Sequence, residues 1–225
     1  FAQVEGMPRA ARLVVPGLPH HITQRGNRRH PTFFCSSDYR LYMTLLARWC
    51  EESATAVWAW CLMPNHVHLV LVPSREDGLA SALGPAHGRY SSLVNAREGW
   101  SGHLWQDRFA SFVMDERHLL ACARYVELNP VRAGLADRAE GWIWSSARAH
   151  LDARPDGLVD ASPLLERWPD WRAVLDAGLE PEMHEAIRTR ERSGRPLGDS
   201  AFLAALSAAG HKRLVPARVR LPHRA

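Results

Sequence analysis

Two apolar segments separated by a three-residue break constrain the fold more than any other feature of the chain. Residues 54–62 have the sequence ATAVWAWCL, residues 66–72 have the sequence HVHLVLV, and Met63-Pro64-Asn65 lies between them. β-Branched and aromatic residues favour strands, and so short a connection joins strands only in the antiparallel sense. The pattern therefore predicts an antiparallel hairpin whose second strand is buried.

The segments on either side of this hairpin complete a β-α-β-β-α-β order. A short strand within residues 12–25 ends at the turn signal Gly26-Asn27. The other expected elements are a helix over 37–53 with Ser37 as its N-cap, a helix over 79–97 interrupted near Gly84-Pro85, a strand over 108–114, and a helix over 116–128 stopped by Asn129-Pro130. This order predicts an α+β fold, a ferredoxin-like antiparallel sheet with helices on one face.

The texture of the sequence changes after Ala149, which predicts two parts. Residues 7–150 form the α+β domain; Met7 is the expected natural start, and residues 1–6 precede it. Residues 151–225 form a helical C-terminal extension with a basic tail, in which 152–163 is a linker and 164–177 and 200–209 are helices. Four cysteines without a CxxC pair, the absence of an apolar run of 18 residues, and an N-terminus unlike a secretory signal predict a cytoplasmic protein without a membrane span.

The charge distribution favours a nucleic-acid partner. The formal net charge is +4, and 27 of the 28 basic residues are Arg, the side chain suited to bidentate phosphate contacts. A GC-rich genome is the alternative explanation of this Arg bias. Residues 151–187 carry a net charge of −6 and residues 188–225 a net charge of +7, a pattern typical of nucleic-acid-binding arms.

The most distinctive motif is PNHVHLVLV. Side chains alternate along a strand, so His66 and His68 point to one face and can converge on one divalent metal. Alternatively, they are two ordinary histidines on a solvated sheet face. A nucleophile must come from elsewhere, and among Tyr39, Tyr42, Tyr90 and Tyr125 we select Tyr90, because its segment HGRYSSLVN is rich in small polar residues. A half-buried packing role is the alternative for Tyr90.

Five motifs occur in an order and at spacings that resemble a known family. They are GLPHHITQRGN, CLMPNHVHLVLVP, GRYSSLVN, SGHLWQDRF and RYVELNPVRAGL. Over residues 9–150 the chain is similar to the REP-associated tyrosine transposases, relatives of the single-tyrosine HUH transposases of small insertion sequences. GRPLGDSAFLAAL, residues 194–206, resembles the C-terminal region of such chains less strongly.

The resemblance implies an HUH nuclease fold, a chemistry and its residues. His66 and His68 would ligate Mg²⁺ or Mn²⁺, and Tyr90 would attack a single-stranded DNA phosphodiester beside a hairpin, leaving a 5′-phosphotyrosine. Family members often have a polar ligand four residues after the tyrosine, a position that Val94 occupies here. Asn95, His87 or water could therefore complete the metal site.

Several basic and aromatic residues are candidates for DNA contacts. Trp105 could stack on a base, with core packing as its alternative, and the tail arginines would add sequence-independent affinity, with a solvated tail as the alternative. The full set is Arg25, Arg28, Arg29, Trp105, Gln106, Arg108, Arg132, Arg213, Arg218 and Arg220.

The expected function is a metal-dependent single-stranded DNA endonuclease and strand transferase acting at hairpin DNA, a nucleoid-associated monomer, with a dimer left open. One alternative is a hairpin-binding regulator whose catalysis has decayed. A second is a zinc hydrolase that uses His66, His68 and Cys61, although the sequence offers no HExxH motif for it.

Overall fold

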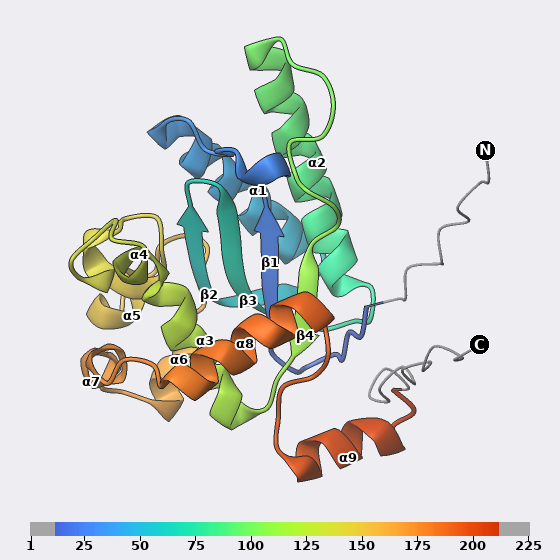
Figure 1. Ribbon diagram of the computed structural model, residues 1–225, viewed down its shortest axis with the longest axis vertical. Helices are drawn as coiled ribbons and strands as arrows, with labels where there is room; N and C mark the ends of the chain where they lie inside the picture. Colours follow the sequence, from blue (N-terminus) through green and yellow to red (C-terminus); the bar gives the residue numbers. More distant parts are fainter. Residues whose placement is uncertain (1–11, 212–225) are drawn as a thin grey trace, which may run out of the picture.

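A four-stranded antiparallel sheet forms the centre of the molecule (Figure 1). The computed structural model describes residues 12–211. The strand order is β2-β3-β1-β4, so β3 lies between the two strands that α1 connects, and the predicted β-α-β-β-α-β order is confirmed. The strands are β1 (His20–Arg25), β2 (Thr55–Met63), β3 (His66–Pro73) and β4 (Ala110–Val113).

The predicted hairpin is formed by β2 and β3. Met63 pairs with His66 next to the turn, and Thr55 pairs with Pro73 at the far end, with a register shift between Val57 and Ala59. The central position of β3 explains its nearly unbroken apolar sequence, because both of its faces are covered.

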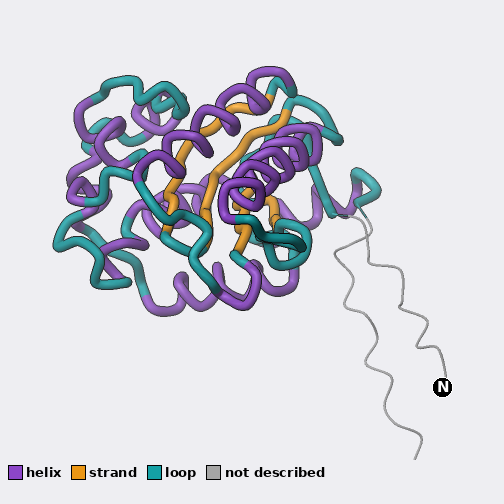
Figure 2. Tube along the Cα trace, turned by 90° about the horizontal axis from the view of Figure 1, so that it is seen from above, coloured by secondary structure: helices purple, strands orange, loops and turns teal. Residues whose placement is uncertain are grey.

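The described residues contain helices on both faces of the sheet. In chain order they are η1 (Asn27–Arg29), α1 (Ser36–Glu52), α2 (Gly78–Glu98), α3 (Glu116–Glu127), α4 (Asn129–Arg132), η2 (Ala139–Gly141), α5 (Ala147–Asp152), α6 (Ser162–Arg167), α7 (Trp171–Asp176), α8 (Pro181–Ser193) and α9 (Ser200–Ala208). Helices α1 and α2 pack on one face, and α3 and α8 contact the other (Figures 1 and 2). The α+β fold is confirmed. The prediction placed helices on one face of the sheet only, whereas the structure has helices on both faces.

Alternation along β3 distinguishes the two faces. Val67, Leu69 and Leu71 belong to the core under α1 and α2, which we call the closed face. His66 and His68 alternate with these residues and lie on the opposite face of the sheet, together with Val70. Val70 belongs to a second buried cluster, which includes residues of α3 and α8. We call this face of the sheet the site face.

Four local predictions differ from the structure. Helix α1 begins at Ser36 after an extended Cys35, so Ser37 is not its N-cap. Helix α2 runs unbroken through Pro85, because its buried stripe packs on the sheet and outweighs the lost hydrogen bond. Helix α3 is followed directly by α4, and the segment 164–177 is divided between α6 and α7. Helix α8 was not predicted, because Ile187 is its only fully buried residue.

The C-terminal extension shares a core with the sheet. Leu164, Trp171 and Ile187 belong to the same buried cluster as Phe112 of β4 and Val126 of α3. Residues 153–161 contain no helix or strand, in line with the predicted linker. The division into residues 7–150 and 151–225 stays a prediction. The shared buried cluster packs the described residues of the two parts against each other.

Candidate active site

The paired histidines project from β3 onto the site face, as alternation predicts. The ring centroids of His66 and His68 are 4.9 Å apart, and the rings are nearly perpendicular. His68 is 3% exposed. The two rings come from adjacent same-face positions of a rigid central strand, so their relative placement is fixed by the sheet.

Hydrogen bonds leave the same ring nitrogen available on both histidines. His66 Nδ1 lies 2.6 Å from Asn65 Oδ1, and because an amide oxygen only accepts, this nitrogen carries the proton. His68 Nδ1 lies 3.1 Å from His21 Nε2. With the Nδ1 atoms engaged, Nε2 is the atom that each ring can offer to a metal.

His21 of β1 is a site residue that sequence analysis missed. Its ring stacks on His68 with centroids 5.2 Å apart, and its Nδ1 lies 3.8 Å from Glu191 Oε1 on α8. One proton arrangement satisfies the chain of contacts: His68 Nδ1 donates to His21 Nε2, and His21 Nδ1–H faces the Glu191 carboxylate. His21 pairs with Val70 of β3, and Val70 lies on the same face as His68 because the two are two residues apart in the strand. The sequence signal was the second histidine of HHITQR.

Burial keeps the three imidazoles neutral. It lowers the pKa of His66 to about 4 and the pKa of His21 to about 3, and it lowers the pKa of His68 well below its usual value. A neutral imidazole has a free lone pair, which is the form that ligates metals. Burial also raises the pKa of the Glu191 carboxyl.

These groups fit a divalent metal. Within residues 12–211, His21, His68 and Glu191 form a cluster whose potential ligand atoms lie within 4.8 Å of one another, and Glu191 Oε1 is buried without a hydrogen-bond partner. His66 and His68 form a second, overlapping donor set through their Nε2 atoms. Cys61, the zinc candidate, has a thiol whose pKa burial raises well above its usual value, and it is absent from the cavity beside the histidines.

Tyr125 of α3 lies against the histidines. Its ring centroid is 5.5 Å from that of His68 and 5.9 Å from that of His21, and the Arg132 guanidinium lies 4.3 Å from its centre. Burial and then the negative charge of the nearby Glu191 carboxylate raise the pKa of this phenol. The tyrosine is therefore protonated at rest and faces a carboxylate.

Asn129 stands four residues after Tyr125, at the start of α4. It lines the same cavity, and its buried Nδ2 has no hydrogen-bond partner. Because the two ends of an amide are exchanged by rotation, Asn129 can equally present its oxygen to the cavity. The chain thus has a polar residue four positions after a tyrosine, at Tyr125 rather than at Tyr90.

A cavity of about 790 Å³ joins these residues to a basic rim. Of the predicted DNA contacts, five line it: Arg25, Arg29, Gln106, Arg108 and Arg132. Arg28 lines a separate cavity. Trp105 is 8% exposed and donates from Nε1 to the His87 carbonyl, which matches the core-packing alternative. Arg213, Arg218 and Arg220 lie outside the described residues.

The structure places Tyr90 away from the paired histidines, on the opposite face of the sheet, and Tyr90 does not line the cavity beside them. Tyr90 is fully buried on the closed face, and its hydroxyl donates to the Thr32 carbonyl at 2.5 Å. It packs among Phe33, Tyr42 and Trp105. Its segment is rich in small residues, but Leu83, Ala86, Tyr90 and Val94 recur at helical spacing and form the buried stripe of α2.

The candidate third ligands near Tyr90 are also remote from the histidine pair. His87 is buried on the closed face, where its Nε2 lies 2.8 Å from the Tyr42 hydroxyl. Asn95 donates to the Gly102 carbonyl at 2.9 Å and lines the separate cavity that contains Arg28. Neither lines the cavity beside His66 and His68.

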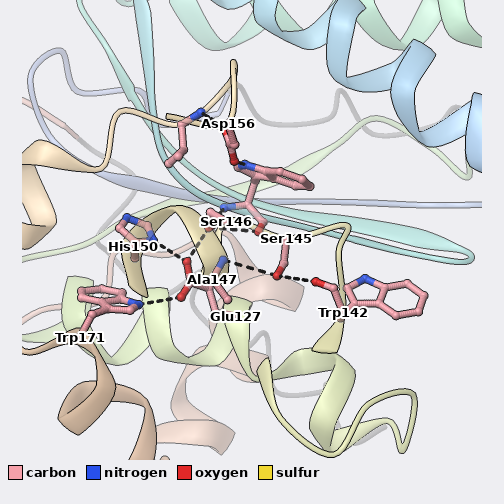
Figure 3. A network of polar contacts seen from close by, with 10 residues as sticks. Glu127, Trp142, Ser145, Ser146, Ala147, His150, Asp156 and Trp171 are labelled. Atoms are coloured by element: carbon pink, nitrogen blue, oxygen red, sulfur yellow. Dashed lines mark hydrogen bonds and ion pairs between the residues drawn. The ribbon is translucent and has the colours of Figure 1, made fainter. Parts of the chain in front are cut away.

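A buried polar network holds α3 in place (Figure 3). Glu127, two residues after Tyr125, accepts hydrogen bonds from Ser146 Oγ at 2.5 Å, from His150 Nδ1 at 2.6 Å and from Trp171 Nε1 at 2.8 Å. Ser146 Oγ also accepts from the backbone of Trp60 in β2. The network ties α5 and α7 to the helix that carries Tyr125, so the extension stabilises the site.

Fold and site together define an α+β protein with a histidine pair and a tyrosine at one basic cavity, a composition suited to phosphodiester chemistry. The family model described as "Transposase IS200 like" matches residues 14–129, and the chain belongs to this transposase family. The resemblance inferred from the five motifs is confirmed at this level.

A comparison with one solved structure agrees with the fold. The chain is similar to a REP-associated tyrosine transposase solved bound to a REP hairpin, with 18% identity, a TM-score of 0.56, and coverage of 69% of this chain and 90% of that one. It also matches a putative transposase from Deinococcus radiodurans R1 with 21% identity, a TM-score of 0.38, and coverage of 53% and 96%. No curated protein matches the sequence.

No helix within residues 12–211 is long and apolar enough to cross a membrane.

Proposed function

We propose that this protein is a metal-dependent single-stranded DNA endonuclease and strand transferase, acting at hairpin DNA through a 5′-phosphotyrosine on Tyr125. One observation carries the proposal: a single basic cavity is lined by His66, His68, Tyr125 and Asn129. Tyr90 is withdrawn as the nucleophile, because its hydroxyl is enclosed on the closed face.

His66 and His68 would hold the metal through their Nε2 atoms, with Asn129 as the third protein ligand. A bound Mg²⁺ or Mn²⁺ would polarise the scissile phosphate and stabilise the charge that develops on it. Two imidazoles and one amide leave coordination positions for phosphate oxygens. The requirement for a divalent metal is part of the proposal.

The arginines of the cavity would position the DNA backbone. Arg25 and Arg29 come from the end of β1 and the turn that follows, and Arg108 comes from the segment before β4. Arg132 lies over the Tyr125 ring, where its charge can stabilise a phenolate and the phosphate that the phenolate attacks. This distribution surrounds the nucleophile with positive charge.

The chemistry balances without a co-reactant. The Tyr125 hydroxyl gives its proton to the nearby Glu191 carboxylate, whose charge acts on this phenol, as the phenolic oxygen forms a bond to phosphorus. The bond between phosphorus and the 3′ oxygen breaks, and that oxygen takes up a proton from water to become a free 3′-OH. One phosphodiester is exchanged for another, so the reverse step can reseal a strand without ATP.

The test is covalent capture. Wild-type protein, a labelled hairpin with a single-stranded extension, and Mg²⁺ or Mn²⁺ should give a denaturation-resistant protein–DNA species. Peptide mapping should place the nucleotide on Tyr125. Cleavage without an adduct would instead identify water as the nucleophile, and an adduct on another tyrosine would overturn the assignment.

One observation favours the alternative of a hairpin-binding regulator without catalysis. Tyr125 is 6% exposed, and Glu191 Oε1 lies 3.6 Å from His68 Nδ1, so α8 covers the site in this arrangement. A regulator would bind the hairpin with no adduct in either metal. The monomeric state and association with the nucleoid also stay proposals, and light scattering of the DNA complex tests the first.

A further inference from the structure

A second cavity, separate from the metal site, opens beside the turn after β1. Its volume is about 300 Å³. Neither histidine of the metal site, nor Tyr125, lines it. Its walls come from this turn and the segment that leads to α1, from the last turns of α2 and from the loop that follows α2. The lining residues on which the argument depends are Asn27, Arg28, His30, Phe34, Trp100 and His103.

Two exposed aromatic rings form one wall. Phe34 is 42% exposed and Trp100 is 49% exposed, and their rings meet edge to face with centroids 5.6 Å apart. Large exposed apolar side chains that contact each other mark binding surfaces more often than isolated ones do. A flat aromatic face accepts any nucleobase by stacking.

Most of the other lining residues are polar, and hydrogen bonds hold them and the Trp100 backbone in place. Asn27 Nδ2 donates to the His103 carbonyl at 3.3 Å, and the Trp100 backbone N–H donates to the Asn95 carbonyl at 2.9 Å. Gly99 ends α2 in the left-handed region, with φ of +66°, and turns the chain so that Trp100 reaches the cavity. Arg28 supplies positive charge, and the ring nitrogens of His30 and His103 supply polar contacts suited to a phosphate or a base edge.

The turn between the two cavities is under backbone strain. Arg28 and Arg29 have φ values of +53° and +63°, in the left-handed region that non-glycine residues rarely adopt. Arg28 lines the aromatic cavity and Arg29 lines the metal site. Strain of this kind persists at sites where it positions functional groups, and here it sends two consecutive arginines to two different cavities.

The turn is held rigidly against its neighbours. A Cβ on Gly26 would collide with the His30 carbonyl oxygen and would lie 2.7 Å from Thr32 Cγ2. The Gly26 backbone N–H donates to the Asn65 carbonyl at 2.8 Å, and Asn65 Nδ2 donates to the Arg29 carbonyl at 3.0 Å. The residue before His66 thus couples the turn to the metal site.

A third cavity, of about 500 Å³, makes the path continuous. It shares Asn27 and His103 with the aromatic cavity, and it shares Gln106, Asp107 and Arg108 with the metal site. A single strand whose phosphodiester lies at Tyr125 therefore has a polar route to Trp100 along these shared residues.

We infer that the cavity of Phe34 and Trp100 binds an unpaired nucleobase of the same DNA strand that is cleaved, stacked on Trp100 and held by Arg28. The inference rests on the proposed function and adds a site that would measure the single-stranded segment beside the hairpin. Stacking supplies affinity without demanding one base, so the cavity would sense the length of the unpaired segment more than its sequence.

The experiment scans hairpins that carry single-stranded extensions on the 5′ or the 3′ side, with an abasic residue placed at each position in turn. In the wild type, one position should weaken binding by roughly 5- to 100-fold when its base is removed. Trp100→Ala should weaken binding of the intact DNA by a similar factor and lose all sensitivity to that abasic position. Trp100→Phe, which keeps a ring, should restore part of both effects.

A fluorescent base analogue at the sensitive position gives an independent readout. Its emission should be quenched on binding to the wild type and not to Trp100→Ala. The matched control is Ile143→Ala, since Ile143 is 52% exposed and lies outside this cavity; it should behave as the wild type does.

The two proposals fail in different ways. Equal abasic sensitivity in the wild type and Trp100→Ala, while the wild type still forms its adduct, would overturn the base-binding site alone. Hairpin binding and base quenching without any adduct would leave this site intact and would remove the catalytic proposal.

Discussion

The two faces of the sheet each bury a tyrosine on a helix, and the two tyrosines differ in what surrounds the hydroxyl. Tyr90 on the closed face is fully buried among aromatic rings, with its hydroxyl satisfied by the Thr32 carbonyl. Tyr125 on the site face is 6% exposed, borders a cavity, and touches Arg132 and the histidine cluster. Burial raises the pKa of both phenols.

Neither burial nor a shifted pKa therefore separates a packing tyrosine from a nucleophile. The useful distinction is the state of the neighbouring polar groups. On the site face, Asn129 Nδ2, His21 Nδ1 and Glu191 Oε1 are buried without hydrogen-bond partners. Such groups are costly and require an explanation, and a metal ion with a DNA phosphate would satisfy them.

The largest expected effect comes from removing the tyrosine hydroxyl on each face of the sheet in turn. Tyr125→Phe should abolish the covalent adduct while hairpin binding remains. Tyr90→Phe should keep the adduct and lower the free energy of unfolding by about 1–2 kcal/mol, because the Thr32 carbonyl loses its buried donor. Gel analysis of the adduct and chemical denaturation measure the two quantities. The reverse result, with the adduct lost only in Tyr90→Phe, would restore the original assignment.

The histidines allow a second comparison between the faces. His66→Ala and His68→Ala should each abolish cleavage in both Mg²⁺ and Mn²⁺, with binding largely kept, because the arginines carry the DNA contacts. His87→Ala should reduce stability by about 2–3 kcal/mol and should still cleave below its melting temperature. If His66→Ala cleaves at the wild-type rate, the metal uses the alternative donor set of His21, His68 and Glu191.

His21 should have an intermediate effect, because it acts through His68. His21→Phe keeps a ring against Phe112 and removes the hydrogen bond to His68 Nδ1, which lies 3.1 Å away. Loss of such an outer partner typically weakens metal binding by about 10- to 100-fold. The metal concentration for half-maximal cleavage should rise by that factor, with the maximal rate recovered at saturating metal. An unchanged metal requirement would assign His21 to packing alone.

The sequence was sufficient to predict those features whose residue pattern fits only one structure. Strand alternation put His66 and His68 on one face, and the short break fixed the hairpin. The sequence was insufficient to choose between the two tyrosines, because Tyr90 and Tyr125 each lie among apolar residues repeated at helical spacing. The spacing of four residues to a polar ligand fits Tyr125 and Asn129, but Leu119, Leu120 and Ala123 give that helix the sequence pattern of a core helix. Helix α8, which supplies Glu191, lacks the apolar stripe that would have revealed it.

The smallest expected effect tests whether a buried ion pair between α1 and α2 stabilises the closed face. Asp38 on α1 is 1% exposed, accepts the Phe34 backbone N–H at 2.8 Å, and pairs with Arg97 of α2. Burial alone would raise the pKa of Asp38, but the hydrogen bonds from Arg97 and Phe34 outweigh it and hold that pKa below its usual value.

The sign of the pH effect follows from that shift. Because the folded-state pKa lies below the unfolded one, Asp38 contributes stability above about pH 4, and this is lost as the pH falls through the folded-state pKa. Asp38→Asn should lower the free energy of unfolding by about 1–2 kcal/mol at pH 7, and the difference from the wild type should shrink in acid. Glu52→Gln breaks an exposed pair with Arg48 and should change stability by less than about 0.5 kcal/mol. Denaturant unfolding from pH 7 to pH 3 measures both variants, and a pH-independent loss in Asp38→Asn would show that packing, rather than the ion pair, joins α1 to α2.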